Sequence, residues 1–167
     1  MKNYKKLFKK SDVGFTLIEL LIVIAIFALI ANVTMVSLNK AKQDSRDAKR
    51  VSNVNQLRSA LHLYSTEKLS YPDGDGIAIG IDGNLVLDNN GWSAGAPPVS
   101  PIFMYSVPRD PSMIAAQTSS PCTGASTEIC DYSYTLNVND YIIYFYLEGS
   151  TGSLDEGIHA ATKDSIL

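Results

Sequence analysis

Apolar residues follow three different patterns along this chain. From Phe15 to Leu38 the residues are mostly apolar, and Glu19 is the one charged residue among them. From Val51 to Tyr64 apolar residues recur every three or four positions, and beyond Tyr71 they come in short runs between glycines, prolines and aspartates. The patterns predict an apolar helix, then an amphipathic helix, then a domain rich in β-strands.

The apolar run is long enough to cross a membrane. Its 24 residues would span about 36 Å as a helix, against a hydrocarbon core about 30 Å thick. A cleavable secretory signal is the alternative, but it would be shorter and would be followed by small residues at the cut site. Here basic residues and Val13-Gly14 precede the run, so a cut before it leaves the helix in the product.

Glu19 is costly inside a membrane, by about 2.5–3.5 kcal/mol at the middle of a helix. Such a residue is expected to have a partner. Cleavage after Gly14 would free the α-amino group of Phe15, four residues away and about one helical turn from the carboxylate. The two charges could pair within one subunit or between neighbours. The alternative is a glutamate near the helix end that reaches the lipid–water interface.

The sequence GFTLIELLIVIAI around Glu19 resembles the processing site of the type IV pilin and type II secretion pseudopilin family. In that family a membrane peptidase cuts after the glycine and methylates the new terminal phenylalanine. The resemblance implies that residues 1–14 are a leader that is removed after Gly14, and that Phe15 becomes the N-methylated terminus. It also implies that Glu19 docks on the terminal amine of a neighbouring subunit during assembly.

A second helical segment follows the apolar run without a glycine or proline before Tyr71. Its apolar stripe comprises Val51, Val54, Leu57, Leu61 and Tyr64, and its other faces carry Arg50, Asn53, Arg58, Ser59 and Glu67. One helix is therefore expected from about Phe15 to Leu69, ending before Pro72. The family resemblance implies that the outer half packs on a small antiparallel sheet, which makes the fold class α+β.

The remaining residues, 72–167, predict a β-rich globular domain. A hairpin is expected from Ile77–Ile81 and Leu85–Asp88 around an Asp-Gly-Asn turn, and Ile102–Val107 is expected to be a strand or a helical turn. The strongest β pattern is DYSYTLNVNDYIIYFYLEG, two runs around Asn137–Asp140. With the leader at 1–14, the predicted divisions are a transmembrane or filament-core helix at 15–38 and an amphipathic continuation at 39–71.

Three short stretches of this domain are similar to pseudopilins. They are Tyr71-Pro72 after the helix, the loop with Pro108, Asp110 and Pro111, and Leu147-Glu148 at the end of the last strong strand.

The net charge bears on nucleic-acid binding, and the two cysteines bear on whether the domain holds a disulfide or a metal. Removal of the leader takes away five of the 14 basic residues and one of the 17 acidic residues, which leaves nine against 16 and a formal charge of −7. That balance disfavours nucleic-acid binding. Cys122 and Cys130 are expected to form a disulfide if this domain is exported; a metal pair is the alternative, but two isolated thiols make a poor zinc site.

No catalytic, metal or cofactor constellation emerges. Ser65 and Lys68 fit a Ser-x-x-Lys pattern, but the Lys-Thr-Gly strand that this chemistry also needs is absent. Asp73, Asp75, Asp82 and Asp88 lack the spacing of a calcium loop and are interpreted as turn formers. The chain is not expected to be an enzyme.

Five basic residues lie in the leader and five between Lys40 and Arg50, so the positive-inside rule does not orient the span. Large domains translocate largely regardless of charge, and the cysteine pair favours an oxidising side. The leader is therefore placed in the cytoplasm, and everything after Asn39 is placed outside the inner membrane. After assembly, the chain is expected in a filament.

The leading hypothesis is a structural subunit of a type IV pilus or type II secretion pseudopilus. Implied partners are further copies of the chain, a prepilin peptidase and N-methyltransferase, an inner-membrane assembly platform, minor pilins and the membrane. The alternatives are a membrane-anchored extracytoplasmic binding domain and a competence-type pseudopilin for DNA uptake; the charge of −7 argues against the second.

Overall fold

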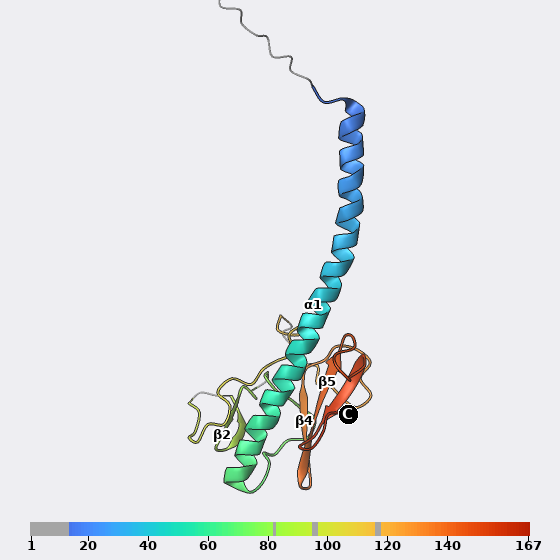
Figure 1. Ribbon diagram of the computed structural model, residues 1–167. Coiled ribbons are helices and arrows are strands. Elements are labelled where there is room, and N and C mark those ends of the chain that lie inside the picture. The colour runs from blue at the N-terminus through green and yellow to red at the C-terminus, as the bar shows by residue number, and fades with distance from the viewer. Residues whose placement is uncertain (1–13, 82, 95–96, 116–117) are drawn as a thin grey trace, which may run out of the picture. The chain divides into compact units, whose positions relative to one another are not determined.

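The structure, a computed structural model, describes residues 14–81, 83–94, 97–115 and 118–167. Within them α1 (Leu17–Lys68) precedes the strands β1 (Ile77–Ala78), β2 (Val86–Asp88), β3 (Gly91–Ser93), β4 (Ser133–Asn137), β5 (Asp140–Leu147) and β6 (Gly157–Ala161) (Figure 1). The chain divides between Asn39 and Lys40 into two compact units. The first holds the start of α1, and the second holds the rest of α1 and these strands.

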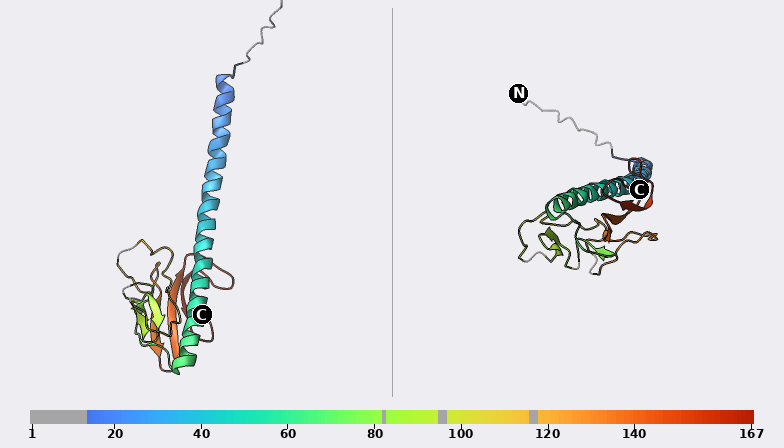
Figure 2. Two further views of the ribbon diagram at one scale, coloured as in Figure 1. Left: turned by 90° about the vertical axis from the view of Figure 1, so that its left-hand side faces the viewer. Right: turned by 90° about the horizontal axis from the view of Figure 1, so that it is seen from below.

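In the second unit, α1 lies along one side and the strands lie on the other (Figure 2). The main sheet is antiparallel with strand order β1-β4-β5-β6, and β2 and β3 form a separate two-stranded sheet. One long helix packed on an antiparallel sheet is a pilin-like α+β arrangement, so the predicted fold class is confirmed.

The helix stripe and β5 build the core. Alternate residues of β5 are buried, because successive side chains of a strand point to opposite faces. The core side chains are Val54, Leu57, Leu61 and Tyr64 of α1 with Tyr134, Tyr141, Ile143, Phe145 and Leu147 of the sheet. The apolar stripe predicted from its three-to-four spacing is therefore confirmed, with Val51 partly buried at its edge.

The predicted polar faces of the helix were wrong at two positions. Arg50 and Asn53 are 0% and 5% exposed, because each has a polar partner inside the domain. Asn53 donates to the Tyr132 hydroxyl at 3.2 Å, and Arg50 lies among buried carboxylates.

The predicted first hairpin was also wrong. β1 pairs with β4, and β2 pairs with β3 across the turn at Asn89-Asn90. The Asp88 carboxylate stabilises this turn by accepting hydrogen bonds from the Asn90 and Val99 backbone N–H groups, at 2.8 and 3.0 Å. Asp88 is thus a turn former, as interpreted from the sequence, whereas Asp82 lies outside the described residues.

Other β elements match the sequence patterns unevenly. β4 and β5 form the hairpin predicted around Asn137–Asp140. Residues 102–107 form neither a strand nor a helical turn; Met104 makes an isolated bridge to Leu87. Strand β6 was not predicted, because Gly-Ile-His-Ala-Ala shows neither clear alternation nor β-branched enrichment.

The predicted disulfide is confirmed. Cys122 and Cys130 are bonded, with Cα atoms 5.1 Å apart, and both are buried. Arg109 donates to Asp131 at 2.6 Å, and Asp131 in turn accepts from the Ser120 backbone N–H at 3.0 Å. The closed loop is therefore tied to the segment that contains Pro108 and Asp110.

Candidate functional site: the N-terminal segment and the apolar helix

The predicted cleavage site lies just before the first turn of α1. Gly14, Phe15 and Thr16 have no regular secondary structure, and the helix begins at Leu17. The Phe15 side chain is 84% exposed, and a Cβ added to Gly14 would meet no atom within 4 Å. Among the described residues, nothing in the chain's own packing requires glycine at position 14. The bond between Gly14 and Phe15 lies in exposed, non-helical backbone.

Glu19 forms a capping box with Thr16 at the start of α1. The Thr16 backbone N–H and hydroxyl both donate to Glu19 Oε2 at 2.9 Å, and the Glu19 N–H donates to the Thr16 hydroxyl at 3.3 Å. This reciprocal pairing satisfies backbone N–H groups that a helix leaves open at its N-terminus. Sequence reasoning missed the role, although Thr-x-x-Glu before an apolar run is its signal.

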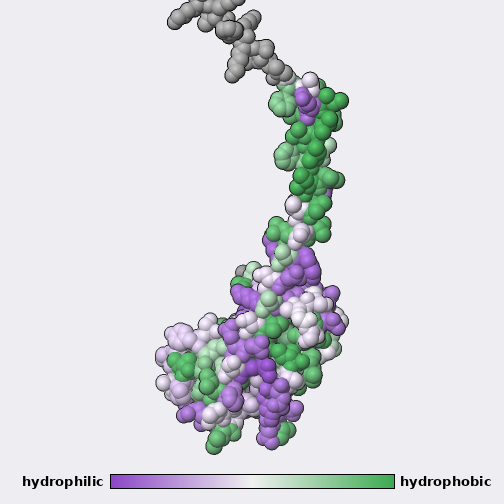
Figure 3. Space-filling view, in the orientation of Figure 1, coloured by the Kyte–Doolittle hydropathy of each residue, from purple (hydrophilic) through white to green (hydrophobic). Residues whose placement is uncertain are grey.

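Two polar side chains of the apolar helix form hydrogen bonds within that helix. Asn32 donates to the Ala28 carbonyl at 2.9 Å and Thr34 to the Ala31 carbonyl at 3.0 Å. By length and composition α1 could span a membrane, and the apolar residues in this part of it are exposed. Figure 3 shows an almost continuous hydrophobic surface along it. Such a surface needs lipid or other apolar helices around it.

Two comparisons relate this chain to known proteins. Residues 14–31 match the prokaryotic N-terminal methylation motif. The type II secretion system core protein G of Aeromonas hydrophila is 33% identical over 64 residues, which cover 38% of this chain and 45% of that protein. The chain therefore matches less than half the length of this relative. No solved structure matches the chain.

Both matches support the resemblance of this chain to the type IV pilin and type II secretion pseudopilin family. Members of this family are structural subunits and not enzymes. The match to the methylation motif covers Gly14, Phe15 and Glu19, the three residues to which the sequence analysis assigned cleavage, methylation and docking.

The chain also holds a cluster of buried charges in its second unit. The Arg50 guanidinium directs all five of its N–H groups at acceptors. Nε and Nη2 bind Asp110 at 2.6 and 3.1 Å, Nη1 lies 2.6 Å from Asp47 and 2.7 Å from Glu148, and Nη2 also donates to Ser112 at 2.8 Å. Burial alone would lower the pKa of Arg50, but the hydrogen bonds to Asp110, Glu148 and Asp47 outweigh it and raise that pKa.

The same cluster joins two stretches that sequence reasoning singled out separately. Asp110 comes from the Pro108–Pro111 loop, and Glu148 follows β5 directly. Glu148 also pairs with Arg46, which donates from Nε at 2.7 Å and from Nη2. Two arginines thus face three carboxylates, and Asp47 Oδ2 is buried with no hydrogen-bond partner within the described residues. Arg50 fixes the loop and the strand end to the helix.

Glu148 makes the stability of this domain pH-dependent. Hydrogen bonds from Arg46, and to a smaller extent from Arg50, lower the pKa of Glu148 from 4.5 to about 2. Burial acts in the opposite direction but is outweighed. The carboxylate is therefore more acidic in the folded chain than in the unfolded chain. Its contribution to stability is complete above pH of about 4.5 and is lost as the pH falls toward 2.

We expect the free energy of unfolding to fall by about 2–3 kcal/mol across this window through Glu148 alone. Chemical denaturation of the detergent-solubilised chain at pH 7 and at pH 2–3 measures the difference. A Glu148→Gln variant is the control: it should be less stable than the unmodified chain at pH 7 and should lose less stability on acidification. An equal loss in both chains would assign the acid sensitivity to other groups.

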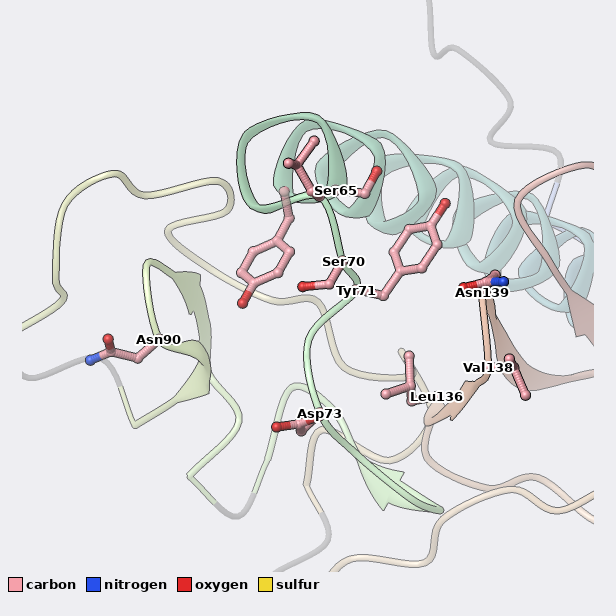
Figure 4. Close-up of a pocket in the computed structure, with 10 residues that line it drawn as sticks. Ser65, Ser70, Tyr71, Asp73, Asn90, Leu136, Val138 and Asn139 are labelled. Atoms are coloured by element: carbon pink, nitrogen blue, oxygen red, sulfur yellow. The ribbon is translucent and has the colours of Figure 1, made fainter.

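Among the described residues, the cavity at the end of α1 does not bring a catalytic set of side chains together. A cavity of about 560 Å³ at the end of α1 is lined by hydroxyl, amide and apolar side chains with Asp73 (Figure 4). Ser65 and Lys68 do not pair there, because the Ser65 hydroxyl donates to the His62 carbonyl and Lys68 donates to Asn89. Within the described residues no group of three or more acidic, histidine or cysteine side chains could hold a metal ion.

Proposed function

We propose that this chain is a structural subunit of a type II secretion pseudopilus or a type IV pilus. It enters the inner membrane as a single-pass protein through residues 15–38, with the leader 1–14 in the cytoplasm and the domain after Asn39 outside. A prepilin peptidase cuts between Gly14 and Phe15 and the new terminus is N-methylated. The subunit then moves, through an assembly platform, into a filament of further copies and related minor pilins.

One observation carries the proposal: a fully exposed apolar helix whose one charged residue, Glu19, lies at the first turn beside a methylation motif. In a simple membrane anchor this carboxylate would serve only as the helix cap that it forms with Thr16. Removal of the leader would create an α-amino group on Phe15, and a neighbouring copy's amine could then take the place of Thr16 on the Glu19 carboxylate. Identical subunits joined head to tail make an open filament.

The geometry around Gly14 supports processing by an external enzyme. The glycine has no close neighbour and no left-handed backbone conformation to account for it. A requirement for a small residue there would therefore come from the peptidase, whose active site must accommodate the residue before the cut. The α1 helix begins two residues after the cut, so cleavage leaves its hydrogen bonds intact.

Intact-mass measurement of the membrane-extracted chain tests this step. We expect the mass to correspond to residues 15–167 plus one methyl group. Gly14→Leu should leave the full-length, unmethylated chain in the membrane, whereas Gly14→Ala is the conservative control and should still be cut. A mature chain that begins after Leu38 would refute the proposal, because it would make the apolar run an ordinary secretory signal.

A membrane-anchored binding domain is the competing function. It predicts that the mature chain stays in the membrane as separate subunits. Electron microscopy of sheared and detergent-extracted material, from cells that also express the peptidase and the platform, separates the two: filaments that contain the chain support the subunit, and their absence supports the anchor.

A further inference from the structure

Three basic side chains gather at one cavity of the second unit. The cavity measures about 300 Å³ and is lined by Arg58, His62 and Lys163 with Tyr71, Tyr141 and two polar residues of α1. Tyr71 and Tyr141 pack edge to face with ring centroids 4.9 Å apart, and they form an aromatic wall.

Arg58 is held in place without being neutralised. It donates from Nε to the Thr162 carbonyl at 2.9 Å, from Nη2 to the Lys163 carbonyl at 3.0 Å and from Nη1 to Asn55 at 3.3 Å. These acceptors carry no net charge. The guanidinium also faces the Tyr141 hydroxyl, whose pKa burial raises to about 12 although Arg58 opposes the change.

The charged side chains that line the cavity, Arg58 and Lys163, are both cations. The Lys163 side chain is exposed and forms no ion pair within the described residues. Two carboxylates adjoin these cations: Asp164 follows Lys163 directly, and Asp140 Oδ1 accepts the backbone N–H groups of Tyr141 at 2.7 Å and Lys163 at 3.2 Å. Neither Asp140 nor Asp164 lines the cavity, whereas Arg58, His62 and Lys163 do.

This cavity is unusual within an acidic chain. Of the described basic residues after Lys49, Arg50 and Arg109 bind carboxylates and Lys68 binds Asn89. Lys68 thus binds an amide, and Arg58 and Lys163, which form no ion pair within the described residues, both line the cavity. Copies that carry a formal charge of −7 repel one another on contact unless cations offset the repulsion.

Two exposed carboxylates lie at the other end of the same strand. Asp155 and Glu156 come directly before β6, and Lys163 comes two residues after it. Both acidic residues are exposed, and no ion pair involves them within the part of the chain that the structure describes. At the rise of an extended strand, the acidic pair and the cavity are roughly 20 Å apart.

We infer that the cavity at Arg58 and Lys163 receives the Asp155-Glu156 pair of a second copy of this chain. Arginine and lysine beside tyrosine hydroxyls suit a pair of carboxylates. Donor and acceptor patches lie at opposite ends of β6, so the contact is not self-complementary and repeats in one direction. The inference rests on the proposed filament and specifies one of its subunit contacts.

Carbodiimide treatment of filaments made from the full chain tests the contact. The reagent joins a lysine amine to a carboxylate within ion-pair distance, and mass spectrometry identifies the two peptides. We expect an intersubunit amide between Lys163 and Asp155 or Glu156. Lys163→Arg keeps the charge but removes the reactive amine, so it should abolish this cross-link.

Charge reversal supplies the second measurement. Lys163→Glu should lower the yield of filaments by on the order of tenfold, because it places like charges together. Combining it with Glu156→Lys alone gives each patch one charge of each sign and should restore part of the yield. Lys49→Glu, at an exposed helix position, is the matched control and should not change the yield. Filaments that show neither the cross-link nor the loss of yield would overturn this contact alone. A complete absence of filaments from the unmodified chain would overturn the proposed function and the contact with it.

Discussion

An Arg50→Ala chain should lose about 3–5 kcal/mol of its free energy of unfolding, because removal of one partner leaves buried carboxylates without compensation. Arg50 and Asp110 are both 0% exposed. Arg50 contacts Asp47, Asp110 and Glu148 at once. In the Arg50→Ala chain, water could hydrogen-bond to these carboxylates in its place only by entering the interior of the domain. The loss should also release the loop that carries Asp110, since no other described cation binds that carboxylate.

Denaturant titration followed by tryptophan fluorescence measures this effect. The chain has one tryptophan, Trp92, whose ring packs on Tyr134 with centroids 5.1 Å apart, so its emission reports unfolding of the second unit. Lys49→Ala is the matched control, an exposed neighbour that should stay within about 0.5 kcal/mol of the unmodified chain. Arg50→Met combined with Asp110→Leu should recover part of the loss, because an ion pair replaced by apolar residues is often tolerated. An Arg50→Ala chain as stable as the control would show that the cluster contributes nothing.

The long helix and the β4–β5 hairpin could be predicted because local patterns determine them. Val54, Leu57, Leu61 and Tyr64 repeat at helical spacing over a stretch without glycine or proline, and their burial follows. In β5, alternate residues from Tyr141 to Leu147 are buried against that stripe. These elements carry most of the apolar surface of the core, so their patterns were strong.

The buried charges were missed because a charged side chain was taken to indicate an exposed face. Arg50 lies four residues before Val54 and seven before Leu57, so it continues the buried stripe by one turn. Its partners lie 60 and 98 positions further along the chain, a distance over which no local pattern reports contact. Residues Asp110 and Glu148 were noted only through family resemblance, and the structure supplies their physical reason.

Pairing among the short strands could not be predicted for a related reason. The sequence Asp82-Gly83-Asn84 contains residues typical of hairpin turns. The hairpin nevertheless forms between β2 and β3, where the Asp88 carboxylate accepts backbone N–H groups. At β1, two residues pair with β4 from more than 50 positions away. In such short strands, side-chain hydrogen bonds and long-range pairing outweigh local turn preference.

Replacing Glu19 with leucine should abolish entry into filaments while leaving insertion and cleavage intact. Loss of a carboxylate from an apolar run makes insertion easier, by up to about 2.5–3.5 kcal/mol at the bilayer centre. If the carboxylate docks on the terminal amine of a neighbouring copy, however, the Glu19→Leu chain has no group that can bind that amine. We therefore expect the cleaved Glu19→Leu chain in the membrane pool and not in sheared filaments, as measured by immunoblotting of both fractions.

The capping box provides the control that separates docking from helix capping. Glutamine at position 19 can still accept the Thr16 N–H and hydroxyl through its amide oxygen, but it carries no charge. Thr16→Val, conversely, removes the cap hydroxyl, at a cost of about 1 kcal/mol, and keeps the Glu19 carboxylate. Docking predicts that Glu19→Gln fails to assemble as Glu19→Leu does, while Thr16→Val assembles. Capping predicts the reverse, with Glu19→Gln normal and Thr16→Val impaired. Normal filament yield from Glu19→Gln would therefore assign Glu19 to its own helix and leave recognition between subunits to other residues.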